Sequence, residues 1–323
     1  MGLLVDGTWF VRAPETPDAS GAFKRQESTF RNWVTRGGSA GPTGEGGFVA
    51  EPGRYHLYVS LACPWAHRTL ILRRLKGLEE MIGLSVVNGH MGDQGWTFAP
   101  GPGVVPDPIN EAMFFYQVYV RAKSNFTGRV TVPVLWDKAR GTIVSNDSAE
   151  IIRMFNSAFN GVGARAGDYY PEERRVRIDE INARVYETVN NGVYKAGFAT
   201  AQAAYDRAVG ELFESLDWLE GLLGAERYLI GDRITEADWR LFTTLVRFDA
   251  VYHGHFKCNI RRLMDYPNLW AYARDLYQQP GVAETVDFFH IKQHYYGSHR
   301  SLNPSGIVPA GPEIDWQVPH GRD

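Results

Sequence analysis

The sequence predicts an α/β region followed by an all-α region within one chain of 323 residues. Between residues 54 and 160, short runs rich in β-branched and aromatic residues alternate with helical segments, which is typical of an α/β domain. In residues 171–296 the apolar residues recur at helical spacing. Residues 1–53 and 297–323 have neither period, so we expect an extended N-terminal arm and an extended C-terminal tail.

The first strand is expected from Tyr55 to Leu61, because aromatic and apolar residues suit a buried strand. It breaks at Ala62-Cys63-Pro64, and the pattern that follows is helical. Proline suits the first position of a helix, where its missing N–H costs no hydrogen bond. Gly77 is expected to close this helix after a basic last turn.

The remaining elements of this domain are predicted from the same patterns. They are a strand at 84–88, a helix at about 110–122, strands at 131–136 and 142–144, and a helix that opens near Asn146. A long polar loop rich in glycine and proline carries Trp96. The resulting order, β-α-β-α-β-β-α, is that of a thioredoxin-like domain.

The second region is predicted to be a bundle of helices. One apolar stripe comprises Ile178, Ile181 and Val185, and a longer one runs over residues 205–223. At Thr235 the hydroxyl can cap the amide of Asp238, and that aspartate can reach back to the threonine amide. This reciprocal pattern predicts a helix start at Thr235.

Bulk composition argues against several classes of function. The formal net charge is −3 and the basic residues are scattered, so no surface for nucleic acid or an anionic membrane is expected. No apolar run approaches the roughly 20 residues of a membrane span, and the N-terminus lacks a secretory pattern. With only two cysteines, Cys63 and Cys258, neither a disulfide framework nor a zinc site is expected. We therefore expect a reduced, cytoplasmic protein without a metal.

Cys63 is the candidate nucleophile. It lies between a strand and a proline-initiated helix, where backbone amides and the helix dipole favour a thiolate. The alternative is a buried, inert cysteine. In Cys63-Pro64-Trp65-Ala66, alanine stands where a second cysteine would resolve a mixed disulfide, so an external thiol is needed. Glutathione is the candidate for that thiol because it is abundant in the cytosol. Cys258 is not expected to be the resolving partner, because it lies far along the chain.

Two other features suit a site for a thiol peptide. A cis bond before Pro133 would present the backbone of Val132 to an extended ligand, although most prolines are trans. Asn146-Asp147-Ser148 opens a helix, where such residues act as caps and amides can bind a carboxylate. Asp147 can also meet an ammonium group. Capping and ligand binding are compatible at this position.

Aromatic residues supply further candidates. Trp96 could cover a thiol ligand. Tyr194, Tyr295 and Tyr296 could present hydroxyl groups to a phenolic substrate. Taken alone, each of them is more typical of a core or surface position, because tyrosine is common.

Several blocks of the sequence together resemble the glutathionyl-hydroquinone reductases, which are the xi class of glutathione transferases. The resemblance covers nearly the whole chain, and it is carried by residues 60–68, 95–98, 129–136, 145–156, 189–200 and 320–322. It implies a glutathione transferase fold with an N-terminal thioredoxin-like domain and a C-terminal helical bundle. It also implies a homodimer that uses glutathione as co-substrate.

The resemblance further implies a role for each candidate residue. Cys63 would attack the sulfur of a glutathionyl-hydroquinone and release the hydroquinone, and a second glutathione would then leave as oxidised glutathione. The residues that would hold glutathione are Trp96, Arg129, Val132, Asp147 and Ser148, with Arg129 on the glycyl carboxylate and Val132 offering its backbone. The residues that would contact the hydroquinone are Tyr194 and Tyr295, and Tyr296 is an alternative to the second. The family usually has glutamate where Asp147 stands, so the γ-glutamyl contact could be weaker.

Two other functions stay open at the level of sequence. An omega-like thiol transferase or dehydroascorbate reductase would use the same cysteine and glutathione site, and only its electrophile pocket would differ. A non-catalytic binding module on the same fold would not depend on Cys63. Neither the physiological quinone nor the dimer interface can be read from the residues.

Overall fold

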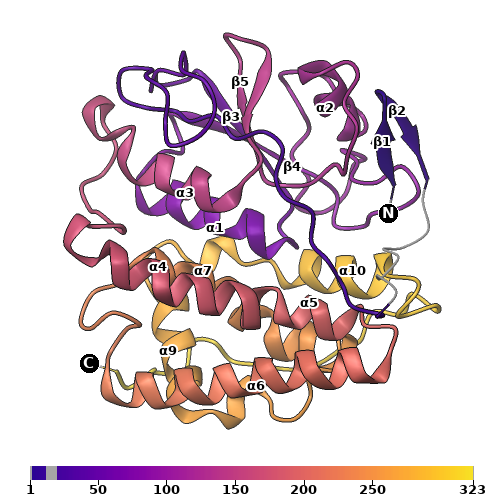
Figure 1. The fold of residues 1–323 in the computed structure, drawn as a ribbon, viewed down its shortest axis with the longest axis vertical. Helices are drawn as coiled ribbons and strands as arrows, with labels where there is room; N and C mark the ends of the chain where they lie inside the picture. The colour runs from indigo at the N-terminus through magenta and orange to yellow at the C-terminus, as the bar shows by residue number, and fades with distance from the viewer. Residues whose placement is uncertain (1, 12–19, 323) are drawn as a thin grey trace. The chain divides into compact units, whose positions relative to one another are not determined.

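The computed structural model describes residues 2–11 and 20–322, which fall into two compact units (Figure 1). Of the described residues, the first unit comprises 2–11, 26–167 and 285–298. The second comprises 20–25, 168–284 and 299–322. Each unit therefore combines segments that are distant in the sequence.

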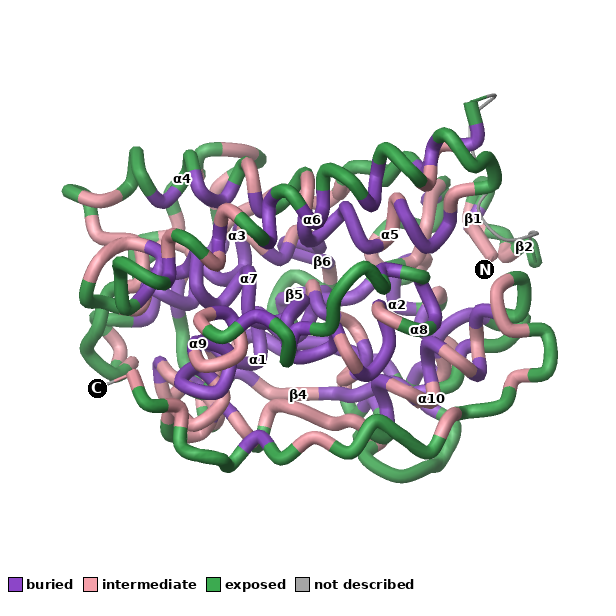
Figure 2. The backbone as a smooth tube through the Cα atoms, turned by 90° about the horizontal axis from the view of Figure 1, so that it is seen from below, coloured by how far each residue is buried: buried purple, intermediate pink, exposed green. Residues whose placement is uncertain are grey.

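The first unit is built on a mixed sheet with the strand order β4-β3-β5-β6. Its strands are β3 (Tyr55–Val59), β4 (Ile82–Val86), β5 (Val134–Asp137) and β6 (Thr142–Ser145). β3 pairs with β4 in parallel and with β5 antiparallel. β3 has a paired strand on each side, and all its residues are buried. β5 is buried as well (Figure 2).

Helices α1 (Pro64–Leu75) and α3 (Ser148–Ser157) pack side by side in this unit (Figure 1). Gly77 follows α1 with a φ of 63°, a backbone conformation that suits glycine after a helix. The order β3-α1-β4-α2-β5-β6-α3, with α2 at Tyr116–Ala122, confirms the predicted fold class. The unit also contains α10 (Phe288–Ser298), which begins within the region predicted to be helical. A hairpin of β1 (Leu3–Val5) and β2 (Thr8–Phe10) completes it, and the sequence did not indicate that hairpin.

Several predicted boundaries are wrong. The strand predicted at 84–88 begins at Ile82, and the one predicted at 131–136 begins at Val134. The helix predicted from about residue 110 begins only at Tyr116. The reason is Asp107, whose Oδ1 accepts hydrogen bonds from the amides of Ile109 (3.0 Å) and Asn110 (3.1 Å). The Asp107 side chain thus competes with helical hydrogen bonding for these amides, and the residues around it form turns instead of a helix.

The second unit is helical over most of its described residues. Its α-helices are α4 (Arg175–Arg184), α5 (Gly192–Gly197), α6 (Gln202–Ala225), α7 (Glu236–Arg247), α8 (His253–His255) and α9 (Pro267–Tyr277). Wider π-helical turns occupy Val185–Asn190 and Phe248–Tyr252, and short 3-10 turns occupy Glu172–Arg174 and Leu263–Asp265. The 3-10 turn Asn160–Val162 belongs to the first unit, and Ala283–Thr285 lies where the chain passes from the second unit back to the first. The capping box predicted at Thr235 and Asp238 is present at the start of α7.

The C-terminal tail has no regular element after Ser298, as predicted for most of it. Side chains nevertheless fix it in place within the second unit. Arg274 of α9 donates to the carbonyls of Val318 (3.1 Å) and Pro319 (2.6 Å). Arg322 donates to the carbonyl of Leu223, in the last turn of α6, at 3.0 Å. The tail therefore provides a donor for the carbonyl of Leu223, one of the last carbonyls of α6, which have no amide partner within the helix.

The contacts group Thr285–Ser298 with the sheet, whereas the sequence assigned residues up to 296 to the helical domain. The partition into domains at residues 54–160 and 171–296 stays a prediction.

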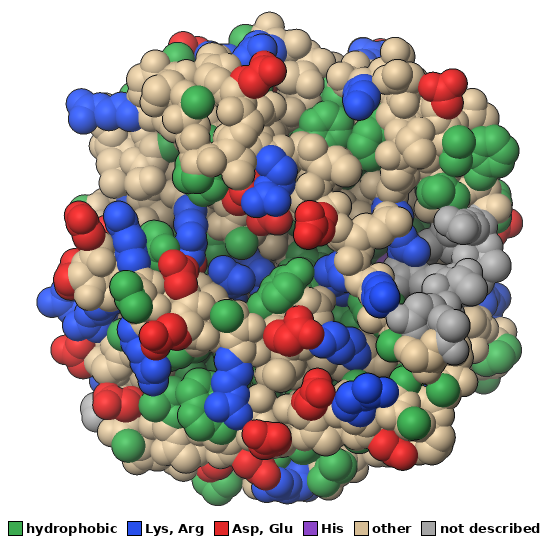
Figure 3. Space-filling model, in the orientation of Figure 1, with side chains coloured by type: hydrophobic (Ala, Val, Ile, Leu, Met, Phe, Trp, Pro, Cys, Tyr) green, Lys and Arg blue, Asp and Glu red, His purple; other side chains and the backbone are tan. Residues whose placement is uncertain are grey.

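No helix within residues 2–11 and 20–322 combines the length and the apolar character that a membrane crossing needs. On the face in Figure 3, Lys and Arg side chains alternate with Asp and Glu.

We expect His56, on β3, to make the protein less stable as the pH falls from about 6.5 to 4. The ring is 3% exposed, its Nε2 lies 2.7 Å from Ser85 Oγ, and burial lowers its pKa to about 4. The unfolded chain therefore takes up a proton near pH 6.5 that the folded chain refuses, which costs up to about 3 kcal/mol.

Urea unfolding at pH 7.5 and 4.5 measures this loss. His56→Gln should show a smaller loss between the two pH values, whatever its stability at pH 7.5. An equal loss in both proteins would contradict the assignment to His56.

Candidate active site

Cys63 is the N-cap residue of α1. Its backbone is extended (φ −78°, ψ 120°), and its carbonyl accepts the first helical hydrogen bond, from the amide of His67 at 3.0 Å. On the strand side, its own amide donates to the carbonyl of Ser60 at 3.1 Å. The side chain is half-buried. The thiol thus lies where a helix begins, and the partial positive charge of that end favours a thiolate.

The Cys63 thiol faces the backbone of Val132. Its Sγ lies 3.6 Å from the Val132 carbonyl oxygen, and the peptide bond between Val132 and Pro133 is cis. The sheet register explains the contact, because Tyr58 of β3 pairs with Val134 of β5. The residues just after β3 and those just before β5 therefore meet at one edge of the sheet.

Asp147 is the N-cap residue of α3, as the sequence predicts. Its Oδ1 accepts from the amides of Ala149 (2.9 Å) and Glu150 (3.1 Å). Ser148 follows as the first helical residue and is buried. The cap is an observed role for Asp147, while a role of either residue in holding a ligand stays a prediction.

Arg68 joins α1 to the start of α3. The guanidinium is 2% exposed, and its Nη1 lies 3.5 Å from Ser148 Oγ. The plane of the group also lies over the Trp65 ring, at 4.5 Å from its centroid. A buried cation therefore lies next to one of the residues expected to hold glutathione.

Trp96 lies in the loop between β4 and α2 and is 7% exposed. Its indole stacks on the imidazole of His294, with ring centroids 4.6 Å apart and an interplanar angle of 28°. His294 belongs to α10, and so does the next residue, Tyr295. Tyr295 is 1% exposed, whereas Tyr296 is half-buried. The structure thus places the loop of Trp96 beside the helix that carries both tyrosines.

Arg129 is half-buried in the segment that leads to Val132. Just before it, Gly128 forms an isolated antiparallel bridge with Leu4 of β1, and their amide–carbonyl distances are 2.9 Å in both directions. The N-terminal hairpin therefore holds the backbone from which Arg129 projects.

Tyr194 belongs to the second unit, on α5, and is half-buried. Its ring is part of an aromatic cluster whose members are Phe23, Phe198, Tyr252 and Phe256. The Arg25 guanidinium lies over the same ring, at 4.7 Å from the centroid, and its Nε donates to Asn191 Oδ1 at 2.7 Å. The cluster orients the tyrosine within its own unit.

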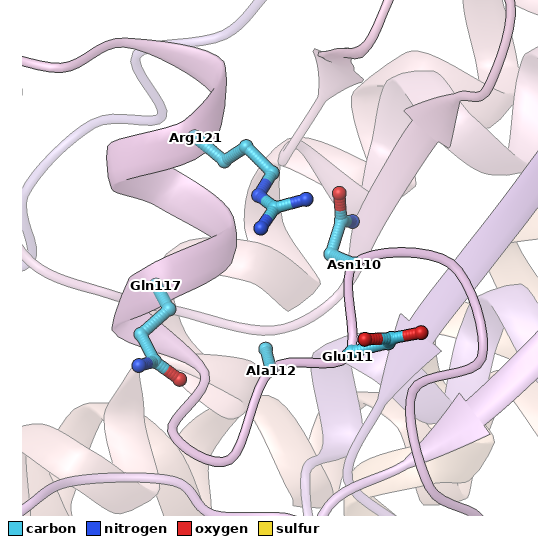
Figure 4. Close-up of a pocket in the computed structure, with 5 residues that line it drawn as sticks. All are labelled: Asn110, Glu111, Ala112, Gln117 and Arg121. Atoms are coloured by element: carbon cyan, nitrogen blue, oxygen red, sulfur yellow. The ribbon is translucent and has the colours of Figure 1, made fainter.

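A separate polar pocket lies between α2 and the segment before it (Figure 4). The residues that line it are Asn110, Glu111, Ala112, Gln117 and Arg121. None of the predicted site residues is among them. Within the described part of the chain, no group of three or more His, Cys, Asp or Glu side chains is arranged to hold a metal ion.

Comparison with known proteins places the chain in a family. A profile of the glutathione S-transferase N-terminal domain matches residues 62–158, and one of the C-terminal domain matches residues 202–275. The glutathionyl-hydroquinone reductase YqjG of Escherichia coli (strain K12) is 59% identical over 324 residues, covering 100% of this chain and 99% of YqjG. The chain belongs to this family of glutathione transferases.

Solved structures agree with the family at the level of the fold. The glutathione-bound structure of YqjG has a TM-score of 0.93 and 57% identity, and the match covers 99% of both chains. A xi-class transferase from Natrialba magadii has a TM-score of 0.92 and 49% identity, covering 100% of this chain and 96% of that one. A further relative, the glutathionyl-hydroquinone reductase PcpF of Sphingobium chlorophenolicum, is 59% identical over 312 residues, or 97% of this chain and 96% of PcpF. The resemblance to the xi class and the predicted glutathione transferase fold are confirmed.

Sequence reasoning missed two residues that border the predicted site. Arg68 belongs to residues 60–68, which carry part of the resemblance, but its burial beside Ser148 of α3 depends on how the two helices pack. His294 is almost two hundred positions from Trp96, so no local pattern could pair the two rings.

We expect the two cysteines to differ sharply in reactivity at pH 8. Cys258 is fully buried, and burial raises the pKa of its thiol, which disfavours the reactive thiolate. Cys63 is half-buried at a helix N-terminus. Titration with a disulfide dye should therefore modify one thiol per native chain and two in denaturant. Cys63→Ser should abolish the native reaction and Cys258→Ser should leave it intact; the reverse result would contradict the assignment.

Proposed function

We propose that this chain reduces glutathionyl-hydroquinones to hydroquinones at the expense of glutathione, with Cys63 as the nucleophile. The observation that carries the proposal is the placement of Cys63 at the start of α1, with its Sγ 3.6 Å from the carbonyl of Val132. Membership in a family whose relatives bear the name glutathionyl-hydroquinone reductase supports the substrate class. Alanine at position 66 supports the need for an external thiol.

The reaction proceeds through a mixed disulfide. The Cys63 thiolate attacks the glutathione sulfur, the bond from that sulfur to the ring carbon breaks, and a proton ends on that carbon. The products of this half are hydroquinone and the Cys63–glutathione disulfide. The thiolate of a second glutathione then attacks this disulfide, releases oxidised glutathione and restores the Cys63 thiolate. In total, one glutathionyl-hydroquinone and one glutathione give one hydroquinone and one oxidised glutathione.

The first unit supplies the groups that we propose to hold glutathione. Val132 offers its backbone next to the thiol, and Arg129 pairs with the glycyl carboxylate. Amides at the start of α3 bind the γ-glutamyl carboxylate beside Ser148, and Asp147 meets the ammonium group. Trp96 covers the ligand. Tyr194 and Tyr295 contact the hydroquinone ring, and a phenol hydroxyl can donate a hydrogen bond to oxygen atoms of that ring.

Two wider properties belong to the same proposal. The chain forms a homodimer, which light scattering after gel filtration measures directly. It works in the cytoplasm, where thiols stay reduced and glutathione is abundant. It needs no metal for the reaction above, because every bond change involves sulfur, carbon and a proton.

Replacing the nucleophile should abolish turnover. With a glutathionyl-hydroquinone and excess glutathione, the intact protein should release hydroquinone and oxidised glutathione in equal amounts. Cys63→Ser should reduce kcat/KM by roughly a thousandfold or more, because the covalent intermediate cannot form. Cys258→Ser is the matched control and should retain full activity.

Two other outcomes would redirect the proposal. An intact protein that reduces a simple mixed disulfide or dehydroascorbate, but not the glutathionyl-hydroquinone, would be an omega-like thiol transferase. Full activity in Cys63→Ser would contradict the role of that residue altogether.

Asp147 combines a cap and a proposed ligand contact, and two variants separate them. Asp147→Asn keeps an efficient cap, so stability should change little, but it removes the charge that meets the ammonium group. KM for glutathione should rise severalfold. Asp147→Ala should raise KM similarly and also cost about 1 kcal/mol of unfolding free energy. Thermal melts and glutathione titrations of both variants check this; an unchanged KM in Asp147→Asn would argue against the contact.

A further inference from the structure

One face of α10 holds the loop that carries Trp96. The loop spans residues 87–104, and both it and α10 belong to the first unit. The helix residues that reach it are His290, His294 and Ser298, which are spaced four apart. Residues at this spacing lie above one another on a single face of a helix.

Each of the three side chains contacts a different part of the loop. His290 Nε2 lies 2.6 Å from the carbonyl oxygen of Pro102. The His294 ring stacks on the Trp96 indole at 4.6 Å. Both rings of this stack are 7% exposed, so each is fixed by its surroundings as well as by the other.

The third contact lies near the start of the loop, where the amide of Met91 donates to Ser298 Oγ at 2.9 Å. The glycines of the loop permit the close approach. A Cβ atom on Gly103, whose φ is 69°, would lie 2.7 Å from His290 Nε2. A Cβ atom on Gly89 would lie 3.3 Å from the same histidine. Glycine at these two positions therefore leaves room for His290.

The segment before α10 contacts α1, the helix that begins at the proposed nucleophile Cys63. Thr285 Oγ1 lies 2.7 Å from Nε2 of His67, a fully buried residue of α1. The amide of His67 in turn donates to the Cys63 carbonyl. A segment near the C-terminus thus contacts both the start of α1 and the loop of Trp96.

We propose that α10 positions the loop for glutathione binding, with His294 as the positioning residue for Trp96. This inference rests on the proposed function, because it assigns to Trp96 the cover of the bound glutathione. An indole in a glycine-rich loop would otherwise sample several rotamers, and the entropy lost on ordering it would weaken glutathione binding. The stack with His294 holds the indole in one orientation before the ligand arrives.

The test measures binding of S-methylglutathione, a thioether that Cys63 does not consume, by calorimetry on the full chain. His294→Ala should raise its Kd about 2- to 10-fold, which is the range of one aromatic pair. His294→Phe keeps an aromatic face for the indole and should restore a Kd close to that of the intact protein. Gln293→Ala, at the adjacent position of α10, is the control and should bind normally.

Turnover gives a second readout that a purely structural role would not produce. In His294→Ala, KM for glutathione should rise while kcat at saturating glutathione stays within about twofold, since the stack acts on binding rather than on the attack. Hydrogen exchange of residues 87–104 should become faster in this variant and slow again with S-methylglutathione. If His294→Ala does not fold, Ser298→Ala removes a milder contact of the same face and should raise the Kd in the same direction.

The outcomes are distinguishable from those of the proposed function. An intact protein that binds S-methylglutathione, together with a His294→Ala variant of equal Kd and KM, would overturn the positioning role alone. An intact protein that does not bind S-methylglutathione would overturn the glutathione site itself, and the role of His294 with it.

Discussion

The junction between β3 and α1 is the constraint on which the rest of the site depends. The chain leaves a fully buried strand and enters a helix within a few residues, and Cys63 is the cap where the helix begins. The antiparallel register of β3 with β5 then brings the cis bond after Val132 to the same edge of the sheet. The proposed nucleophile and a backbone segment suited to an extended thiol ligand are therefore placed together by strand pairing, without any contact specific to the ligand.

Local signals explain what the sequence predicted correctly. The aromatic content of β3, the proline that opens α1 and the capping box at Thr235 each act within a few residues, so they can be read directly. The late start of α2 was missed because a single side chain, that of Asp107, takes amides that the helical pattern had assigned to a helix. The β1–β2 hairpin was missed because short strands carry little local signal. The helical character of α10 was predicted, but its grouping with the sheet was not, because no local pattern shows which unit a helix packs against.

The residues of the candidate site also divide into those that local patterns could predict and those that they could not. Cys63, Val132 and Asp147 could be proposed from turn, cap and proline chemistry, and the structure gives each of them the local geometry that this chemistry needs. Ser148 and the tyrosines could be named as candidates from the residues, but their individual roles, and Arg129 altogether, came from the resemblance to the family. Arg68 and His294 could be found only in three dimensions, because their contacts depend on helix packing and on a segment from the far end of the chain.

The proposed contacts to glutathione come from one unit, whereas the proposed contacts to the hydroquinone ring come from both. The proposed nucleophile and the residues proposed to hold glutathione all lie in the first unit, and so does Tyr295 on α10. Tyr194 lies in the second unit within an aromatic cluster of its own. Substitutions in that cluster could therefore alter the accepted ring while Cys63 and its surroundings stay unchanged.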